Sequence, residues 1–144
     1  MKQEDTVDFQ IRGTWARISR IYNNEAVKFG GTMSLGYILL NIDKDGTPST
    51  SLGPKMGMES TSLTRSLRKM EDEGLIKRVK DKIDKRRVKI HLTEEGKKMR
   101  KVSKDVVLQF NNNLRSKISK EKLAIFHEVI GELNEILDEN NIFS

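Results

Sequence analysis

The side chains best suited to binding chemistry are basic and lie in one short segment. Residues 77–89 carry eight Lys or Arg side chains and only two acids, Asp81 and Asp84. This segment accounts for the whole net charge of +6, because the residues before it and those after it each balance to zero. A concentrated positive charge of this kind is typical of phosphate binding, although a solvated charged loop would also explain the charge alone.

A second group of polar side chains lies just before the basic segment. Leu63, Leu67 and Met70 recur at helical spacing, which predicts a helix over about residues 60–73. The outer face of that helix carries Ser60, Thr61, Thr64, Arg65 and Arg68. Arginine can donate two hydrogen bonds to guanine, and small hydroxyl residues let a backbone approach phosphates or base edges. Many helices carry such a face toward solvent only, so this pattern is informative mainly together with the basic segment.

Further helices are expected on both sides of these two segments. Apolar periodicity favours helices over residues 6–29, 33–43 and 94–115, and a last helix from Ser119. Thr32 and Thr93 are well placed to cap the second and third of these helices, since a side-chain hydroxyl can accept from the first free amides. The first and last helices carry apolar faces, and periodicity alone does not decide whether their own chain or another one buries these faces.

A shorter helix is expected immediately before the polar one. It would begin at a cap on Ser49 or Thr50 and run through Lys55. Gly53 and Pro54 weaken this expectation, because glycine is entropically costly in a helix and proline lacks an amide donor. The short helix and the polar helix would be joined by a turn containing glycine, as in a helix-turn-helix.

The basic segment itself is expected to form a hairpin. Val88, Ile90 and Leu92 alternate with polar residues, which is typical of a half-buried strand, and residues 76–80 are the expected partner strand. His91 would then point outward beside the hairpin. The turn between the strands is charged, and a tip of this kind suits the minor groove of DNA.

This order of elements predicts a mainly α fold with a small β-hairpin, a winged helix-turn-helix. In that fold the polar helix lies in the major groove, which is wide enough to admit it. A carboxylate beside an arginine reduces the side-chain entropy that the arginine loses on binding, and Asp84 stands two residues before Arg86. The sequence therefore favours a protein that binds duplex DNA.

Two blocks of sequence resemble the MarR family of bacterial transcription regulators. The first covers residues 63–76, and the second covers residues 84–96. The second block resembles the family's wing motif, an Asp-x-Arg turn that leads into a Leu-Thr-x-x-Gly junction. The order of helices extends the resemblance over nearly the whole chain. One departure is the segment Ser51–Met56, where the family normally has a Leu-Ala pair and no proline.

The resemblance implies a homodimer that binds a palindromic operator, usually as a repressor released by a small-molecule effector. It implies dimerisation helices at residues 1–31 and 97–144 around a DNA-binding lobe at residues 32–96, within one compact chain. The recognition residues would be Ser60, Thr61, Ser62, Thr64, Arg65 and Arg68. The hairpin residues would be Lys82, Asp84, Lys85, Arg86 and Arg87. A cytoplasmic location in a bacterium is expected with these roles.

The aromatic residues of the first helix have two interpretations. Trp15 and Tyr22 lie on its apolar face and could line an effector pocket. Aromatic residues at helical spacing are more often core or dimer interface. His91 and His127 are isolated from each other and from other metal-ligating residues in the sequence, so we expect no metal site.

The composition argues against several other classes of protein. The chain has no cysteine, which excludes disulfides, thiol redox sensing and Cys-ligated zinc. No apolar run approaches the length of about 20 residues that a membrane helix needs. No phosphate loop, nucleophile elbow or metal-ligand spacing is present, so we expect neither an enzyme nor a cofactor. A winged-helix module for protein contact or for non-specific nucleic-acid binding is the remaining alternative.

Overall fold

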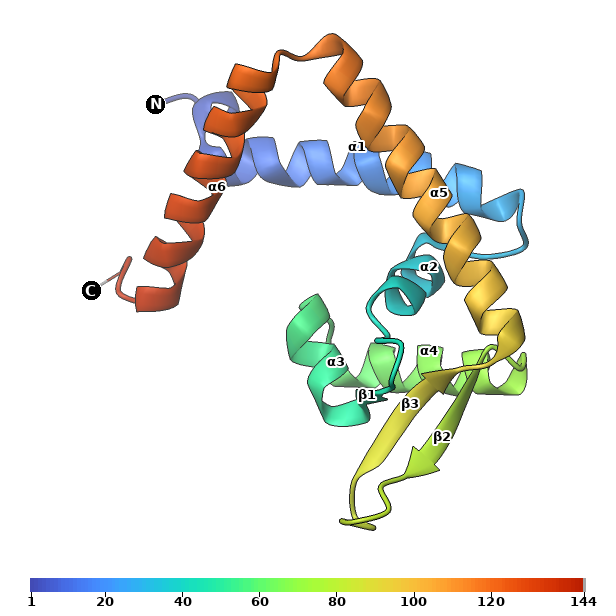
Figure 1. Ribbon diagram of the computed structural model, residues 1–144. Coiled ribbons are helices and arrows are strands. Elements are labelled where there is room, and N and C mark those ends of the chain that lie inside the picture. The colour runs from blue at the N-terminus through green and yellow to red at the C-terminus, as the bar shows by residue number, and fades with distance from the viewer. Residues whose placement is uncertain (144) are drawn as a thin grey trace. The chain divides into compact units, whose positions relative to one another are not determined.

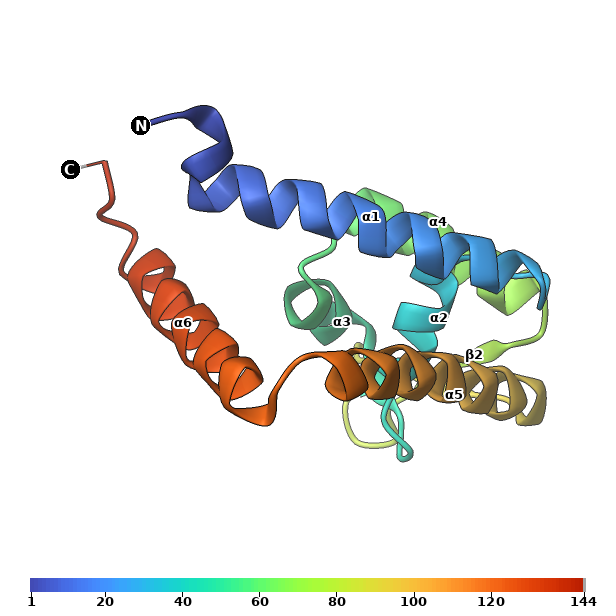
Figure 2. The same ribbon diagram turned by 90° about the horizontal axis from the view of Figure 1, so that it is seen from above.

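The computed structural model describes residues 1–143 and is mainly helical. Its contacts divide the chain into two compact units, one over residues 1–106 and one from Val107 onward. The first unit opens with a short 3-10 turn, η1 (Gln3–Asp5), and with α1 (Val7–Val27), which is one unbroken helix (Figure 2). No helix of the described residues is both long enough and apolar enough to cross a membrane.

A lobe of three helices and a small sheet follows α1 in the first unit (Figure 1). The helices are α2 (Met33–Leu40), α3 (Ser49–Met56) and α4 (Ser60–Asp72). The strands β1 (Thr47–Pro48), β2 (Ile76–Lys80) and β3 (Val88–Leu92) pair antiparallel in the order β1-β3-β2. The helical content and the predicted hairpin are therefore confirmed, and the fold is a winged helix-turn-helix.

The core of the lobe joins all of these elements. Ile38, Leu39, Leu52 and Ile90 have no solvent-exposed surface, so α2, α3 and β3 meet at one point. The other buried members of the core are Leu35, Ile42, Met56, Leu63, Leu67, Met70, Leu75 and Ile76. Burial of these side chains is the main force that fixes the orientation of α4, because that helix contributes three of them.

The helix boundaries follow the expected caps with two exceptions. Thr32 Oγ1 accepts from the Leu35 amide at 3.1 Å, and Ser119 Oγ accepts from the Lys122 amide at 3.2 Å, as expected. The predicted cap of α3 at Ser49 or Thr50 is wrong, because Pro48 is the N-cap and makes no side-chain bond to the helix. The prediction that α2 reaches residue 43 is also wrong, because the backbone leaves the helix after Leu40.

One feature of this region was not predicted from the sequence. The strand β1 has only two residues, which is too short to show any periodicity. Its Thr47 is almost fully buried, and Thr47 Oγ1 accepts from the Asp43 amide at 2.7 Å. The helix α3 continues past Pro54, as expected, and runs to Met56. It ends at Gly57, whose φ of 64° is easily adopted by glycine.

The start of α5 (Glu94–Lys117) is fixed to the end of α4 by one junction. Thr93 Oγ1 donates to the Gly74 carbonyl at 2.6 Å and accepts from the Gly96 amide at 3.0 Å, so the predicted cap is confirmed. The Thr93 amide donates to the Leu75 carbonyl at 3.1 Å. A Cβ on Gly96 would lie 2.0 Å from that same carbonyl oxygen. The Leu-Thr-x-x-Gly pattern of the sequence therefore has a direct steric reason.

The second unit contains the end of α5 and α6 (Lys120–Glu139). No residue of α6 is buried in this single chain, although its apolar residues recur at helical spacing. Phe126, Val129 and Leu137 each keep about half of their surface exposed, at 55%, 54% and 51%. The helix α1 also has no buried residue and exposes Phe9, Ile11 and Trp15.

We expect Gly96→Ala to lower the free energy of unfolding by about 1–3 kcal/mol, because the added methyl group must displace the Leu75 backbone. Urea unfolding at one fixed protein concentration measures this change. Gly13→Ala is the matched control, because a Cβ there meets nothing within 4 Å and alanine favours a helix by roughly 0.5–1 kcal/mol. Equal stability of Gly96→Ala and the wild type would contradict the steric account of the junction.

Candidate nucleic-acid interface

The helix α4 has two faces of opposite character. Leu63, Leu67 and Met70 face the core with at most 5% of their surface exposed. The other face carries the predicted recognition residues Ser60, Thr61, Ser62, Thr64, Arg65 and Arg68, and all of them are exposed. All of these except Ser62 line one shallow hollow on the surface of the lobe. The structure therefore brings five of the six residues into one place.

The two arginines of this face are free to bind a partner. Within the described residues, neither Arg65 nor Arg68 forms an ion pair or a side-chain hydrogen bond. The nearby acid Glu71 instead pairs with Arg78 of β2, with 3.5 Å between Oε2 and Nε. Thr64 Oγ1 donates to the Ser60 carbonyl at 2.8 Å, which commits its proton to the helix. The face thus offers two unpaired guanidinium groups beside one threonine methyl group.

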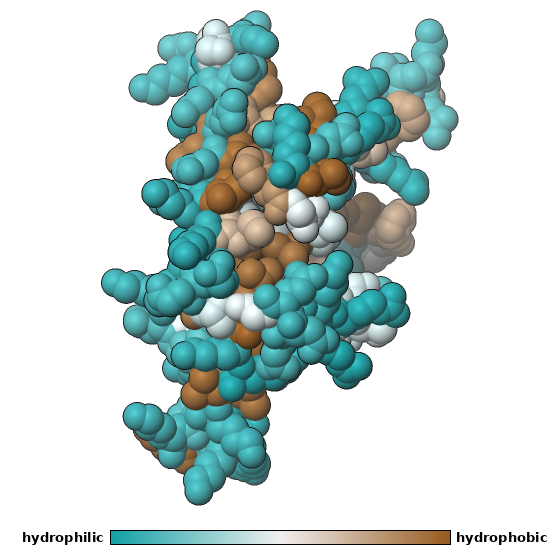
Figure 3. Space-filling view, turned by 90° about the vertical axis from the view of Figure 1, so that its right-hand side faces the viewer, coloured by the Kyte–Doolittle hydropathy of each residue, from teal (hydrophilic) through white to brown (hydrophobic). Residues whose placement is uncertain are grey.

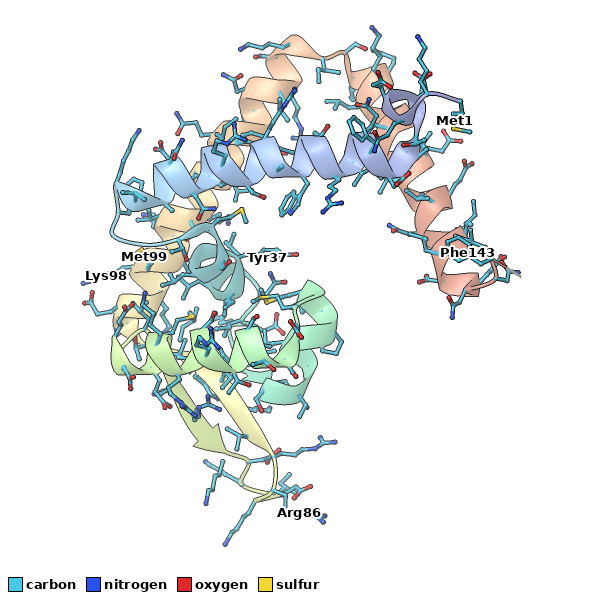
Figure 4. All side chains as sticks on the ribbon, turned by 180° about the vertical axis from the view of Figure 1, so that it is seen from behind. Met1, Tyr37, Arg86, Lys98, Met99 and Phe143 are labelled. Carbon is cyan, nitrogen blue, oxygen red and sulfur yellow. The ribbon has the colours of Figure 1, made fainter. Side chains whose placement is uncertain are left out.

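The hairpin formed by β2 and β3, called the wing from here on, projects from the lobe (Figure 1). Figure 4 shows Arg86 at the end of the wing that lies farthest from α4. The surface of the wing is mostly hydrophilic, with small apolar areas (Figure 3). Four predicted basic residues of its turn are exposed, namely Lys82, Lys85, Arg86 and Arg87.

Asp84 organises the turn of the wing. Its Oδ1 accepts from the Arg86 amide at 3.1 Å and lies 3.4 Å from Arg86 Nε. The Arg87 amide donates to the Asp84 carbonyl at 3.0 Å, and the Asp81 amide donates to the Arg87 carbonyl at 2.9 Å. Arg86 nevertheless keeps 93% of its side chain exposed, so Asp84 directs the arginine without covering it.

The strand β2 adds basic residues that were not assigned to the site from the sequence. Lys77, Arg78 and Lys80 are exposed along this strand, which lies at the edge of the sheet. The sequence signal for them was their place in the basic segment. The pairing of Arg78 with Glu71 was not visible there, because it depends on the packing of β2 beside α4.

The model of the MarR family matches residues 32–88, which run from the cap of α2 to the start of β3. This segment contains both the polar face of α4 and the turn of the wing. This segment of the chain is therefore similar to the MarR family.

Other comparisons extend the likeness beyond the lobe. The transcriptional regulator SarZ of Staphylococcus aureus is 29% identical over 118 residues, which cover 72% of this chain and 80% of SarZ. The structure of S. aureus MepR in complex with DNA aligns with a TM-score of 0.85 at 20% identity, over 94% of this chain and 99% of MepR. The structure of Streptococcus pneumoniae FabT in complex with DNA aligns with a TM-score of 0.71 at 20% identity, over 90% of this chain and 96% of FabT. At this identity the two structures show that this chain shares their fold.

The aromatic residues predicted for an effector pocket lie on the same side of α1, two turns apart. Trp15 exposes 54% of its surface, whereas Tyr22 is partly covered and its burial raises the pKa of the phenol. Their role in binding a ligand stays a prediction. His91 lies on the face of β3 opposite the buried Ile90, but it is half-buried because its ring lies over Gly46, where a Cβ would be 2.5 Å from Cε1. Within the described residues no cluster of three or more metal-ligating side chains exists.

We expect Asp84→Ala to loosen the turn of the wing and to speed amide hydrogen exchange at Arg86 and Arg87. The reason is that alanine removes the acceptor of the Arg86 amide. Asp84→Asn is the matched control, since its side-chain oxygen still accepts that amide while the charge is lost. Exchange rates measured by NMR distinguish the two variants. If the amides of both variants exchange equally fast, and faster than those of the wild type, charge rather than hydrogen bonding holds the turn.

Proposed function

We propose that this chain is a transcription regulator that binds specific duplex DNA as a homodimer. The observation that carries the proposal is that one lobe presents a polar helix face with two exposed arginines and the basic wing, which together suit adjacent grooves of DNA. The names of the compared proteins support it, because SarZ is a transcriptional regulator and MepR and FabT were seen with DNA. In this proposal the protein acts in the cytoplasm of a bacterium.

The polar face of α4 has the chemistry to read bases in the major groove. Arg65 and Arg68 have no competing acid in the described residues, so each can donate two bonds to guanine. Thr64 has committed its hydroxyl proton to Ser60, and its methyl group remains for contact with a thymine methyl group. We therefore expect a half-site that contains guanine and thymine opposite this face.

The wing contributes in a different way. Its exposed Lys and Arg side chains suit phosphates and the narrow minor groove, where the negative potential is deepest. Arg86 is the residue that we assign to the minor groove, because Asp84 directs its side chain away from the lobe. The wing therefore supplies much of the affinity, and α4 supplies most of the base preference.

The homodimer is proposed from the apolar faces at both ends of the chain. The exposed apolar residues of α1 are Val7, Phe9, Ile11, Trp15, Ile21 and Val27, and those of α6 are Ile125, Phe126, Val129, Ile136 and Leu137. Apolar patches of this extent are typical of surfaces that bind a partner. A second copy of the chain would cover residues 1–31 and 97–144 and would place two lobes on a palindromic site.

Repression with release by an effector completes the proposal. Trp15 and Tyr22 are the residues that we assign to the effector, on the side of α1 where Tyr22 is already partly buried. An effector changes DNA binding only if it binds one arrangement of the two lobes better than the other. The operator-bound arrangement would then lose population as the effector concentration rises.

Selection of duplexes from a random library tests the proposed function. We expect the selected duplex to be pseudo-palindromic, with half-sites about 10 base pairs apart. The protein should bind it about a thousandfold more tightly than a scrambled duplex at moderate salt. Arg86→Ala should weaken binding to this selected duplex. Enrichment of no motif, with equal salt-sensitive binding to every duplex, would mean that the wing is only an electrostatic anchor and would remove the proposal.

A pair of substitutions separates base reading from phosphate contact. We expect Arg65→Ala to weaken binding by about 1–3 kcal/mol and to relax the preference at one position of each half-site. Lys85→Ala should instead weaken all duplexes alike and reduce the salt slope by about 1 per chain. Affinity for all single-base variants of the selected site, measured at two salt concentrations, checks both. Uniform weakening by Arg65→Ala would show that α4 contacts only phosphates.

A further inference from the structure

One apolar side chain of the wing has no role in the fold. Ile83 exposes 97% of its surface in the middle of the turn. Among the large apolar residues between the two chain ends, the next most exposed is Val27 at 72%. The other residues from 80 to 87 are all charged. An isoleucine in this setting gains nothing from the core, and water solvates it poorly.

The turn holds Ile83 at its exposed position. The Ile83 amide donates to Asp81 Oδ1 at 3.0 Å, which makes a local turn stabilised by the aspartate side chain. Asp84 makes the equivalent bond to the Arg86 amide on the other side of the turn. The two aspartates therefore fix the backbone on both sides of Ile83 and leave its side chain outside. Lys82 lies next to it, and Arg86 lies three residues further along the chain.

We propose that Ile83 enters the minor groove beside Arg86, partly unstacks a base step there and bends the DNA. This inference rests on the proposed function, in which the wing contacts the minor groove. Proteins that bind in this groove often insert an apolar side chain between base pairs and kink the duplex. The walls of the groove are sugars and base edges, which cover apolar surface better than water does. Lys82, Lys85 and Arg86 are exposed beside Ile83, where they can neutralise the phosphates that border the groove.

Insertion of Ile83 would favour certain DNA sequences at the base step where the wing enters the groove, although no polar group of the protein contacts the bases of that step. Pyrimidine–purine steps such as TA are the most easily unstacked, whereas A-tracts are stiff. The operator should therefore carry a flexible step where each wing enters. The preference for that step should depend on Ile83 and should be independent of Arg65 on α4.

The test measures bending and step preference together on the selected operator. The DNA bend is obtained from energy transfer between dyes at the two duplex ends, and unstacking is obtained from 2-aminopurine fluorescence at the flanking step. We expect wild type to bend the operator by at least about 20°. It should also bind TA at least threefold better than AA at the flank. Ile83→Ala and Ile83→Ser should lose at least half of the bend and the whole of this preference.

Two further variants complete the test. Ile83→Leu keeps an apolar side chain of the same size and should bend the operator as wild type does. Val79→Ala shortens another exposed apolar residue of the wing, at 39% exposure on β2, and should leave bend and step preference unchanged. Because Ile83 packs on nothing, its variants should unfold at the urea concentration of the wild type.

Failure of the inference and failure of the proposed function look different. If Ile83→Ala selects the same palindrome, bends it equally and still prefers TA, Ile83 does not enter the groove and the DNA-binding proposal stands. If wild type selects no motif at all, the proposed function fails and the inference fails with it. If Val79→Ala reduces the DNA bend as much as Ile83→Ala does, the role of Ile83 is also overturned. Removal of any exposed apolar side chain from the wing would then reduce the bend.

Discussion

The close contact between Gly96 and the Leu75 carbonyl sets the geometry on which the rest of the lobe depends. At this point the chain has left α4, and it must pair β2 with β3 and then begin α5 within a few residues. Thr93 satisfies the Gly74 carbonyl and the first amides of α5 with one hydroxyl group. The absence of a side chain at residue 96 lets the two backbones approach. The base of the wing, the end of α4 and the start of α5 are therefore oriented by backbone contacts, which are stiffer than contacts between surface side chains.

This stiffness explains how a lobe with a small core can present two groups of residues accurately. The core is one cluster shared by α2, α3, α4 and β3, and α4 contributes its whole inner face to it. The outer face of α4 then makes few contacts within the chain. Among the described residues its two arginines stay unpaired, while the nearby Glu71 pairs with Arg78. At the wing, by contrast, the order comes from aspartate side chains. Residues that serve the fold and residues that are free to serve a partner are thus almost completely separate.

Much of the fold could be predicted because its determinants are local in sequence. Thr32, Thr93 and Ser119 each cap a helix within three residues, and the alternation of Val88, Ile90 and Leu92 is confined to one strand. The contact between Asp84 and Arg86 was predictable for the same reason.

The strand β1 could not be predicted, since two residues show no periodicity and its pairing with β3 joins segments that are distant in the sequence. The place of His91 over Gly46 depends on that pairing. The full exposure of Ile83 was also invisible, because it depends on how the turn is hydrogen-bonded. The surface that covers the apolar faces of α1 and α6 could not be predicted either. The periodicity of apolar residues shows that a face needs cover, but it does not show which surface provides that cover.

The position of β2 at the edge of the sheet has a consequence for the protein before it meets any partner. An edge strand presents unpaired amides and carbonyls, to which a strand from another molecule can add. Here the exposed side chains of that strand include Lys77, Arg78 and Lys80. Two such edges repel each other, so wings of different molecules should not join into extended sheets at the concentrations reached during synthesis. The charge of the wing would therefore also protect the newly made chain from aggregation.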